Sequence, residues 1–282
     1  MIGQIISALP DIANQHARSS KLYAVLAKIS EAAIKESRLK LSDGCIQLGE
    51  FGNLEFPYHN MGEIDTLDLF GLDELIIFSF YLVNCERYAR SADIGANLGL
   101  HSILMSRCGW QVSAYEPDPI HANLLRRNLD LNLTKNVKVF EDAISDKSGT
   151  LEFVRVLGNT TGSHLAGAKL NPYGVLERFP VNVLPIDSVM ANADFIKLDA
   201  EGQERLILLA TNATQWKTTD MMLEVGSAEN AIAIFNHMTA LGINLFSQKL
   251  NWENVKSIDG MPTSYKEGSL FITAKSKMPW LR

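Results

Sequence analysis

The residues best suited to chemistry lie at the ends of two neighbouring strand candidates. Asp93 ends the first and is followed by a glycine turn, Gly95-Ala96-Asn97-Leu98-Gly99, that leads into a helix. Glu116 ends the next strand candidate, and a carboxylate at this spacing suits the hydroxyls of a nucleoside ribose. The helix after the turn points free N–H groups towards the same place. The pattern therefore predicts a site for a nucleoside cofactor.

The glycine pattern distinguishes two kinds of nucleoside cofactor. A dinucleotide site has G-x-G-x-x-G, in which the second glycine admits a pyrophosphate. Asn97 stands in place of that glycine here, and Leu100 stands in place of the third. Asp93 before the turn suits a cation, which favours S-adenosylmethionine, a molecule with an amino group, a sulfonium and no phosphate. A nicotinamide-dependent oxidoreductase is a disfavoured alternative, and a purely structural turn capped by Asn97 is another.

Composition limits the class of protein. The chain has 282 residues, of which 46% are hydrophobic, and a formal net charge of −6. This charge argues against a broad nucleic-acid-binding surface. Cys45, Cys85 and Cys108 lack metal-ligand spacing and are typical of free thiols in a reducing compartment, so a cytoplasmic protein is predicted. We find no run of about 18 apolar residues that could span a membrane.

Strand and helix candidates alternate from residue 88 onwards. Strands are predicted at 88–94, 111–116, 137–141, 194–199, 221–225, 243–247 and 269–274, and helices at 98–107, 119–131, 203–210 and 228–241. This alternation predicts an α/β fold with a mostly parallel sheet and helices on both faces. The closeness of the last two strands predicts an antiparallel edge.

The region between residues 147 and 189 interrupts the alternation. Strands at 151–156 and 181–184 are expected to pair with each other. They enclose a polar loop that contains Asn159–His164, which is either a substrate surface or a solvated excursion.

The first 85 residues precede the alternation and are predicted to form a helical and short-strand extension. Apolar positions recur at helical spacing from about Ser20 to Leu39, and Leu69–Asn84 is expected to be a buried helix. We therefore divide the chain into an extension, residues 1–85, and a cofactor-binding domain, residues 86–282. The extension is expected to pack on the core, to cap the substrate cleft or to join two subunits of a homodimer.

Four motifs occur in the order found in the FkbM family of S-adenosylmethionine-dependent methyltransferases, which the chain resembles over roughly residues 50–275. They are Asp93–Gly99, Tyr115–Pro119, Glu141–Ser145 and Ile196–Gly202, the last of which reads Lys-x-Asp-x-Glu-Gly. The resemblance implies a class I methyltransferase fold, which is Rossmann-like and has a seven-stranded, mostly parallel sheet with one antiparallel strand near its edge. It also implies O-methyl transfer to a hydroxyl of a small molecule, a sugar or a glycoconjugate.

The resemblance also implies roles for single residues. Asp93 would hold the methionine end of the cofactor, and Glu116 would accept hydrogen bonds from both ribose hydroxyls. Pro117 would flank the adenine, whose amino group would donate to Asp142, with the backbone of Ala143 beside it. A turn or capping role for Asp142 is the alternative. The cofactor turn itself would be shaped by Gly95, Ala96, Asn97 and Gly99.

The fourth motif supplies groups expected to act on the acceptor. Lys197 lies in an apolar stretch, where a buried ammonium needs a carboxylate partner, and Asp199, Glu201 and Glu224 are candidates. A structural ion pair that only orders the strand ends is the alternative. Because the sulfonium already activates the methyl group, the protein must hold a nucleophilic oxygen in line and accept its proton.

The candidate bases are Asp199, Glu201, Glu224 and, in last place, His164. No metal site is predicted. A catalytically silent S-adenosylmethionine-binding partner protein is the alternative from another functional class.

Overall fold

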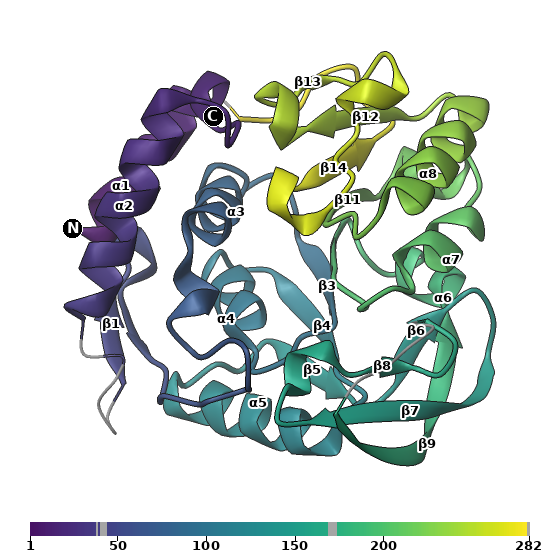
Figure 1. Cartoon of the computed structure of the whole chain (residues 1–282), viewed down its shortest axis with the longest axis horizontal. Coiled ribbons are helices and arrows are strands. Elements are labelled where there is room, and N and C mark those ends of the chain that lie inside the picture. Colours follow the sequence, from purple (N-terminus) through teal and green to yellow (C-terminus); the bar gives the residue numbers. More distant parts are fainter. Residues whose placement is uncertain (38, 40–43, 169–173, 281–282) are drawn as a thin grey trace.

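The computed structural model describes residues 1–37, 39, 44–168 and 174–280. These residues form a large sheet between two groups of helices, with a smaller sheet at one side (Figure 1). None of the helices in these ranges is long and apolar enough to cross a bilayer.

The large sheet has eight strands within the described residues, in the order β13-β12-β14-β11-β10-β3-β4-β5. The five strands from β11 to β5 run parallel, and β14 runs antiparallel between β11 and β12. The seven strands expected from the sequence are all present. The expected strand number was one too low, because β13 has only two residues and no periodicity could reveal it. The bounds are β3 (Arg90–Ile94), β4 (Gln111–Tyr115), β5 (Val137–Phe140), β10 (Phe195–Leu198), β11 (Asp220–Leu223), β12 (Asn244–Ser247), β13 (Glu253–Asn254) and β14 (Leu270–Thr273).

Successive strand residues point into two different hydrophobic layers. In β10, Phe195 packs with the layer that contains α3, α4 and α5, whereas Ile196 and Leu198 pack with the layer that contains α6, α7 and α8. Both faces are covered, which explains why all four residues of β10, of β11 and of β14 are buried. These helices are α3 (Leu72–Val83), α4 (Leu100–Arg107), α5 (Pro119–Leu131), α6 (Ile186–Met190), α7 (Glu204–Leu209) and α8 (Ala228–Leu241).

The N-terminal helices α1 (Ile2–Ala8) and α2 (Lys21–Lys35) lie along one side of the molecule, with the C-terminal end of the chain nearby (Figure 1). Ile6 and Leu9 are buried in the same hydrophobic cluster as Phe195 of the large sheet. The extension therefore shares a core with the sheet, and the division at residue 85 stays a prediction. A short hairpin, β1 (Cys45–Gln47) and β2 (Asn53–Glu55), follows α2.

A buried histidine anchors the extension. The ring of His16 packs edge-on against Trp280 and lies 2.9 Å, through Nδ1, from the Trp252 indole nitrogen. Its Nε2 lies 3.0 Å from the Leu9 carbonyl oxygen. Burial lowers the pKa of His16 to about 4, an effect that the carbonyl contact only partly offsets. The ring is therefore neutral at neutral pH.

The smaller sheet has the order β6-β9-β7-β8, and its two long strands pair as expected, with Leu151 opposite Val181. The loop after β7 is packed against the protein rather than solvated. Thr160 donates its N–H to the Met61 carbonyl at 2.7 Å, and its hydroxyl lies 2.9 Å from His121 Nε2. The strands are β6 (Ala143–Ser145), β7 (Gly149–Leu157), β8 (His164–Leu165) and β9 (Val175–Pro185).

Candidate active site

The turn after β3 is held by two neighbouring strand ends. The N–H groups of Gly95 and Ala96 both donate to the Tyr115 carbonyl at 3.0 Å. Gly95 has a φ of +76°, and a Cβ on it would lie 1.8 Å from the Asp199 carbonyl oxygen. The backbone of the fourth motif therefore fills the space beside Gly95. The first and fourth motifs are therefore in direct contact.

Buried carboxylates line the same turn. Asp93 is fully buried and accepts a hydrogen bond from Ser102 Oγ through Oδ2 at 2.6 Å. Glu116 accepts from the N–H groups of Asn97 at 2.8 Å and Asp118 at 2.9 Å. Burial raises the pKa of Glu116 to about 8, and the two N–H groups oppose this rise without cancelling it. The turn thus carries one acid that is largely neutral at pH 7.

The ends of β10 and β11 bring together a second group of charges. Lys197 Nζ lies 2.9 Å from Asp199 Oδ2, so of the three partners that the sequence offered the structure selects Asp199. Burial lowers the pKa of Lys197, but the charges of Asp199, Asp93 and Glu74 raise it more, and the ammonium stays charged. A small cavity of about 40 Å³ lies at this point. Its polar lining consists of Glu74, Lys197, Asp199, Glu224 and Ser269.

Two of the three carboxyl groups of this cavity, Asp199 and Glu224, lie in different environments. Burial, together with the charges of Asp199 and Glu74, raises the pKa of Glu224 well above its ordinary value. This shift favours the protonated form of Glu224, which can donate a hydrogen bond. Asp199 is ion-paired and its side chain is 43% exposed, which suits a charged carboxylate. Such a difference between neighbouring acids is the usual basis for dividing acid and base roles.

The other catalytic candidates lie in different settings. Glu201 does not share a strand face with Asp199, because β10 ends at Leu198 and Glu201 lies in the following turn with a φ of +47°. His164 lies in β8 with a buried ring, and its Nδ1 is 2.9 Å from the Gly162 carbonyl oxygen. No described contact joins either residue to the Lys197 ammonium.

The predicted adenine-side residues lie where the large sheet passes into the smaller one. Asp142 accepts a hydrogen bond from Asn182 Nδ2 at 2.6 Å, and Ala143 is buried at the start of β6. Pro117 is half-buried directly after Glu116.

Sequence analysis missed an anchor of the smaller sheet. Arg155 of β7 donates from Nε and Nη2 to the two carboxylate oxygens of Asp118, at 2.7 and 2.6 Å. Asp118 also caps α5 by accepting from the Ile120 N–H. A bidentate pair of this kind fixes the smaller sheet beside the second motif. The only sequence signal for this contact was the second acid of Glu-Pro-Asp-Pro.

A second omission was Glu74 with its neighbours. Glu74 lies in the first turn of α3, and His101 Nε2 of α4 lies 3.0 Å from its Oε2. The hydroxyl of Tyr81 lies 2.9 Å from His101 Nδ1. Although burial raises it, the charges of His101 and Lys197 hold the pKa of Glu74 below its ordinary value. An acid in the first turn of a helix is common for reasons of helix polarity, so nothing in the sequence marked it.

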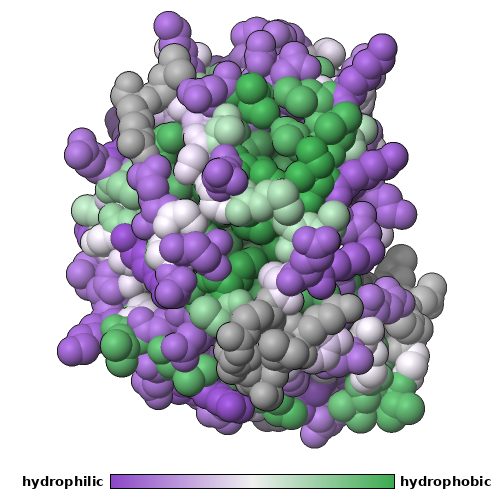
Figure 2. Space-filling view, turned by 90° about the vertical axis from the view of Figure 1, so that its left-hand side faces the viewer, coloured by the Kyte–Doolittle hydropathy of each residue, from purple (hydrophilic) through white to green (hydrophobic). Residues whose placement is uncertain are grey.

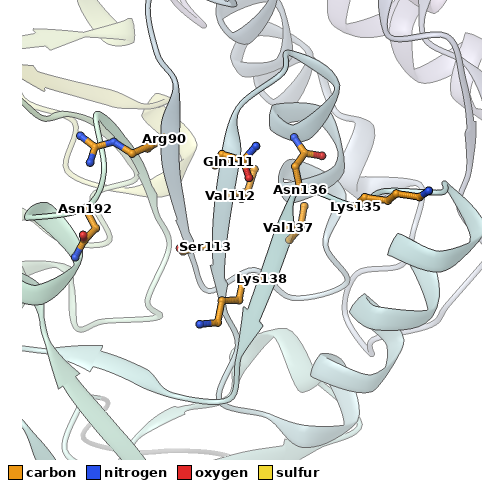
Figure 3. A pocket seen from close by; sticks show the side chains of 9 residues that line it. All are labelled: Arg90, Gln111, Val112, Ser113, Lys135, Asn136, Val137, Lys138 and Asn192. Atoms are coloured by element: carbon orange, nitrogen blue, oxygen red, sulfur yellow. The ribbon is translucent and has the colours of Figure 1, made fainter.

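A larger pocket lies at the opposite edge of the sheet. It has a volume of about 290 Å³ and is lined by the first residues of β3, β4 and β5. Its side chains of Arg90, Lys135 and Lys138 extend in different directions (Figure 3). Cations that diverge do not form an anion site, so this pocket carries no functional assignment.

The fold and the site together define a class of protein. The strand order β5-β4-β3-β10-β11-β14-β12, with β14 antiparallel and acids at the ends of β3 and β4, is that of a class I S-adenosylmethionine-dependent methyltransferase. The family described as "Methyltransferase FkbM domain" matches residues 93–246. The chain belongs to this family, which confirms the resemblance seen in the motifs.

Individual relatives are more distant. Methyltransferase sdnD of Sordaria araneosa is 28% identical over 159 residues, a match that covers 44% of this chain and 61% of sdnD. The METTL16 MTase domain covers 98% of this chain and 92% of its own, with 14% identity and a TM-score of 0.46. The O-methyltransferase TomG of Streptomyces achromogenes, solved in complex with SAM, covers 70% and 78%, with 11% identity and a TM-score of 0.38.

The site has acceptor atoms that suit the cofactor of this family, S-adenosylmethionine. Asp93 Oδ1 and Asn97 Oδ1 are buried and have no hydrogen-bond partner among the described residues. A buried acceptor without a donor is unfavourable, and S-adenosylmethionine offers an ammonium group and two ribose hydroxyls. Each oxygen of Glu116 has bonded one N–H and keeps a second lone pair. The residues present therefore fit the cofactor.

Proposed function

We propose that the chain is an O-methyltransferase that acts on a hydroxyl of a small molecule, a sugar or a glycoconjugate. The observation that carries this proposal is the Lys197–Asp199 pair beside Glu224. It provides an ion-paired carboxylate and an acid with a raised pKa in one cavity. The backbone of Asp199 touches the cofactor turn at Gly95, so the pair lies next to the methyl donor.

Each group has a distinct role in this proposal. When bound, S-adenosylmethionine supplies an electrophilic methyl group on its sulfonium. Asp199 accepts the proton of the acceptor hydroxyl, and Lys197 keeps Asp199 ionised until the acceptor arrives. Glu224 donates a hydrogen bond that orients the acceptor oxygen. Glu201 and His164 are the next candidates for the base.

On the cofactor side, Asp93 holds the methionine end and Glu116 holds the ribose. Asp142 accepts from the adenine amino group, between the Pro117 ring and the Ala143 backbone. The turn that supports them consists of Gly95, Ala96, Asn97 and Gly99.

The test is turnover of S-adenosylmethionine to S-adenosylhomocysteine with fractions of a small-molecule extract as acceptor. Asp199→Asn keeps the shape and removes the charge, so we expect turnover to fall by about 10²–10⁴-fold, the usual contribution of a general base. Affinity for S-adenosylhomocysteine should change only a few-fold. Glu201→Gln is the matched control and should keep most activity.

Other outcomes identify other arrangements. If Glu201→Gln is inactive and Asp199→Asn is active, the two roles are reversed. If the wild type binds the cofactor but turns over no fraction, the catalytically silent partner protein becomes the better hypothesis.

A homodimer is also part of the proposal. Figure 2 shows the side of the molecule on which the N-terminal helices lie, where apolar side chains form a band between hydrophilic ones. On α2, Val25 and Ile29 are 53% and 40% exposed. We expect light scattering to show the mass of two chains, and Ile29→Glu to return it to that of one.

A further inference from the structure

Two carboxylates, the buried Asp93 and the half-buried Glu74, flank the first turn of α4. Consecutive residues of this helix contact them: His101 lies 3.0 Å from Glu74, and Ser102 donates to Asp93 at 2.6 Å. Asp93 comes from β3 and Glu74 comes from α3, so residues far apart in the sequence meet at the start of one helix.

Each carboxylate keeps one unsatisfied oxygen. Asp93 Oδ1 and Glu74 Oε2 are buried atoms without a hydrogen-bond partner in the described part of the chain. His101 Nε2 lies 3.0 Å from Glu74 Oε2, and this neighbour favours the ionised form of Glu74. Two buried acceptors without donors are unfavourable in the free protein and are suited to a ligand that supplies N–H groups.

Both carboxylates act on the same neighbours. Their charges raise the pKa of the Tyr81 hydroxyl, together with its burial, and both contribute to holding Lys197 charged. Asp93 is also the strand neighbour of Lys197 in the β3–β10 pairing. Glu74 lines the small cavity together with Lys197, so both carboxylates lie near this ammonium.

The charges of this space define its ligand. Three acids, Asp93, Glu74 and Asp199, lie near the single ammonium of Lys197, which is an excess of acidic groups. A cation compensates this excess, and an ammonium group has three N–H donors for two carboxylates. A neutral hydroxyl would supply one donor and no charge.

We propose that Glu74 is a second cofactor-binding carboxylate. With Asp93, it accepts hydrogen bonds from the α-ammonium group of S-adenosylmethionine. His101, which is anchored by Tyr81, is a positioning residue that holds Glu74 in place. The inference rests on cofactor binding and is independent of O-methyl transfer.

The experiment compares two ligands by titration calorimetry. S-adenosylhomocysteine has the ammonium group, whereas 5′-methylthioadenosine has the same nucleoside and thioether sulfur but no amino-acid portion. Glu74→Gln should weaken S-adenosylhomocysteine binding by about 10- to 100-fold, the scale of a lost charge-assisted hydrogen bond, and leave 5′-methylthioadenosine binding within twofold. Glu253→Gln, a change at an exposed acid of β13, should alter neither affinity.

The role of His101 is tested with the same ligand pair. His101→Phe should weaken S-adenosylhomocysteine binding selectively, and His101→Asn, which keeps an N–H donor, should restore part of it. Equal weakening of both ligands by Glu74→Gln would show a structural role and overturn the inference. Unchanged binding of S-adenosylhomocysteine would overturn it as well. If the wild type binds neither ligand, the cofactor assignment itself fails, which is a separate result.

Discussion

Replacement of Lys197 by methionine tests whether the buried charge cluster is held together by this one ammonium. The side chain is 9% exposed and lies 2.9 Å from Asp199, with Asp93 and Glu74 acting on it as well. Loss of one partner from a buried pair costs about 3–5 kcal/mol. Asp199 is 43% exposed, so water can solvate its charge when the ammonium is removed. The decrease in the free energy of unfolding therefore comes mainly from Asp93 and Glu74. We therefore expect Lys197→Met to lower the free energy of unfolding by about 3 kcal/mol, the lower end of that range.

The assay is urea unfolding at pH 7.5 and pH 5.5, with Lys28→Met on the exposed side of α2 as the control. Without Lys197, burial dominates and the folded-state pKa of Glu74 rises above its unfolded value. The variant therefore regains stability as the pH falls and this group binds a proton. The loss should thus be smaller at pH 5.5 than at pH 7.5. A loss below 1 kcal/mol at both pH values, or an equal loss at both, would refute the reasoning.

Three further predictions follow from single contacts. Since the pKa of Glu116 is about 8 and ribose hydroxyls favour its ionised form, S-adenosylhomocysteine binding at pH 7 should release close to one proton. Calorimetry in buffers of different ionisation enthalpy measures this release, which Glu116→Gln should abolish. Gly95→Ala should lower the unfolding free energy more than Gly109→Ala. Both sites have positive φ, but only Gly95 meets a neighbouring backbone, so Gly109→Ala should cost just the backbone strain of about 1–2 kcal/mol. The pKa of His16 is about 4 in the folded state and 6.5 unfolded, so wild-type stability should fall by roughly 3 kcal/mol as the pH drops across that interval. His16→Gln should remove this fall.

The parts of the fold that were predictable have local causes. The bounds of α5 and α8 agree with the sequence prediction residue for residue, because Asp118 and Ser227 cap their first turns and Gly242 ends α8 in the left-handed conformation. The cofactor turn could be located because its acid, glycines and following helix are contiguous. The alternation of elements predicted the α/β class and the mostly parallel sheet.

The parts that were missed depend on contacts between distant segments. No sequence pattern links Glu74 to His101, since an ion pair between α3 and α4 leaves no periodic trace. The sequence indicates that another group lies close to Gly95, but it does not show that this group is the Asp199 carbonyl. The pairing of Lys197 with Asp199 could be identified only once the end of β10 at Leu198 was known. Glu201 lies in the turn that follows and no longer has strand conformation.

The contact between Gly95 and the Asp199 carbonyl has a consequence for how such an enzyme diversifies. The loop that carries the donor and the loop that carries the proposed base abut through backbone atoms, so substitutions of side chains do not change their spacing. The relative position of the methyl donor and the proposed base is then set by the backbone fold and not by individual side chains. The loop after β7 and the N-terminal helices join the sheet largely through side chains. Changes in these segments can accommodate new acceptors without altering the distance between the donor and the proposed base.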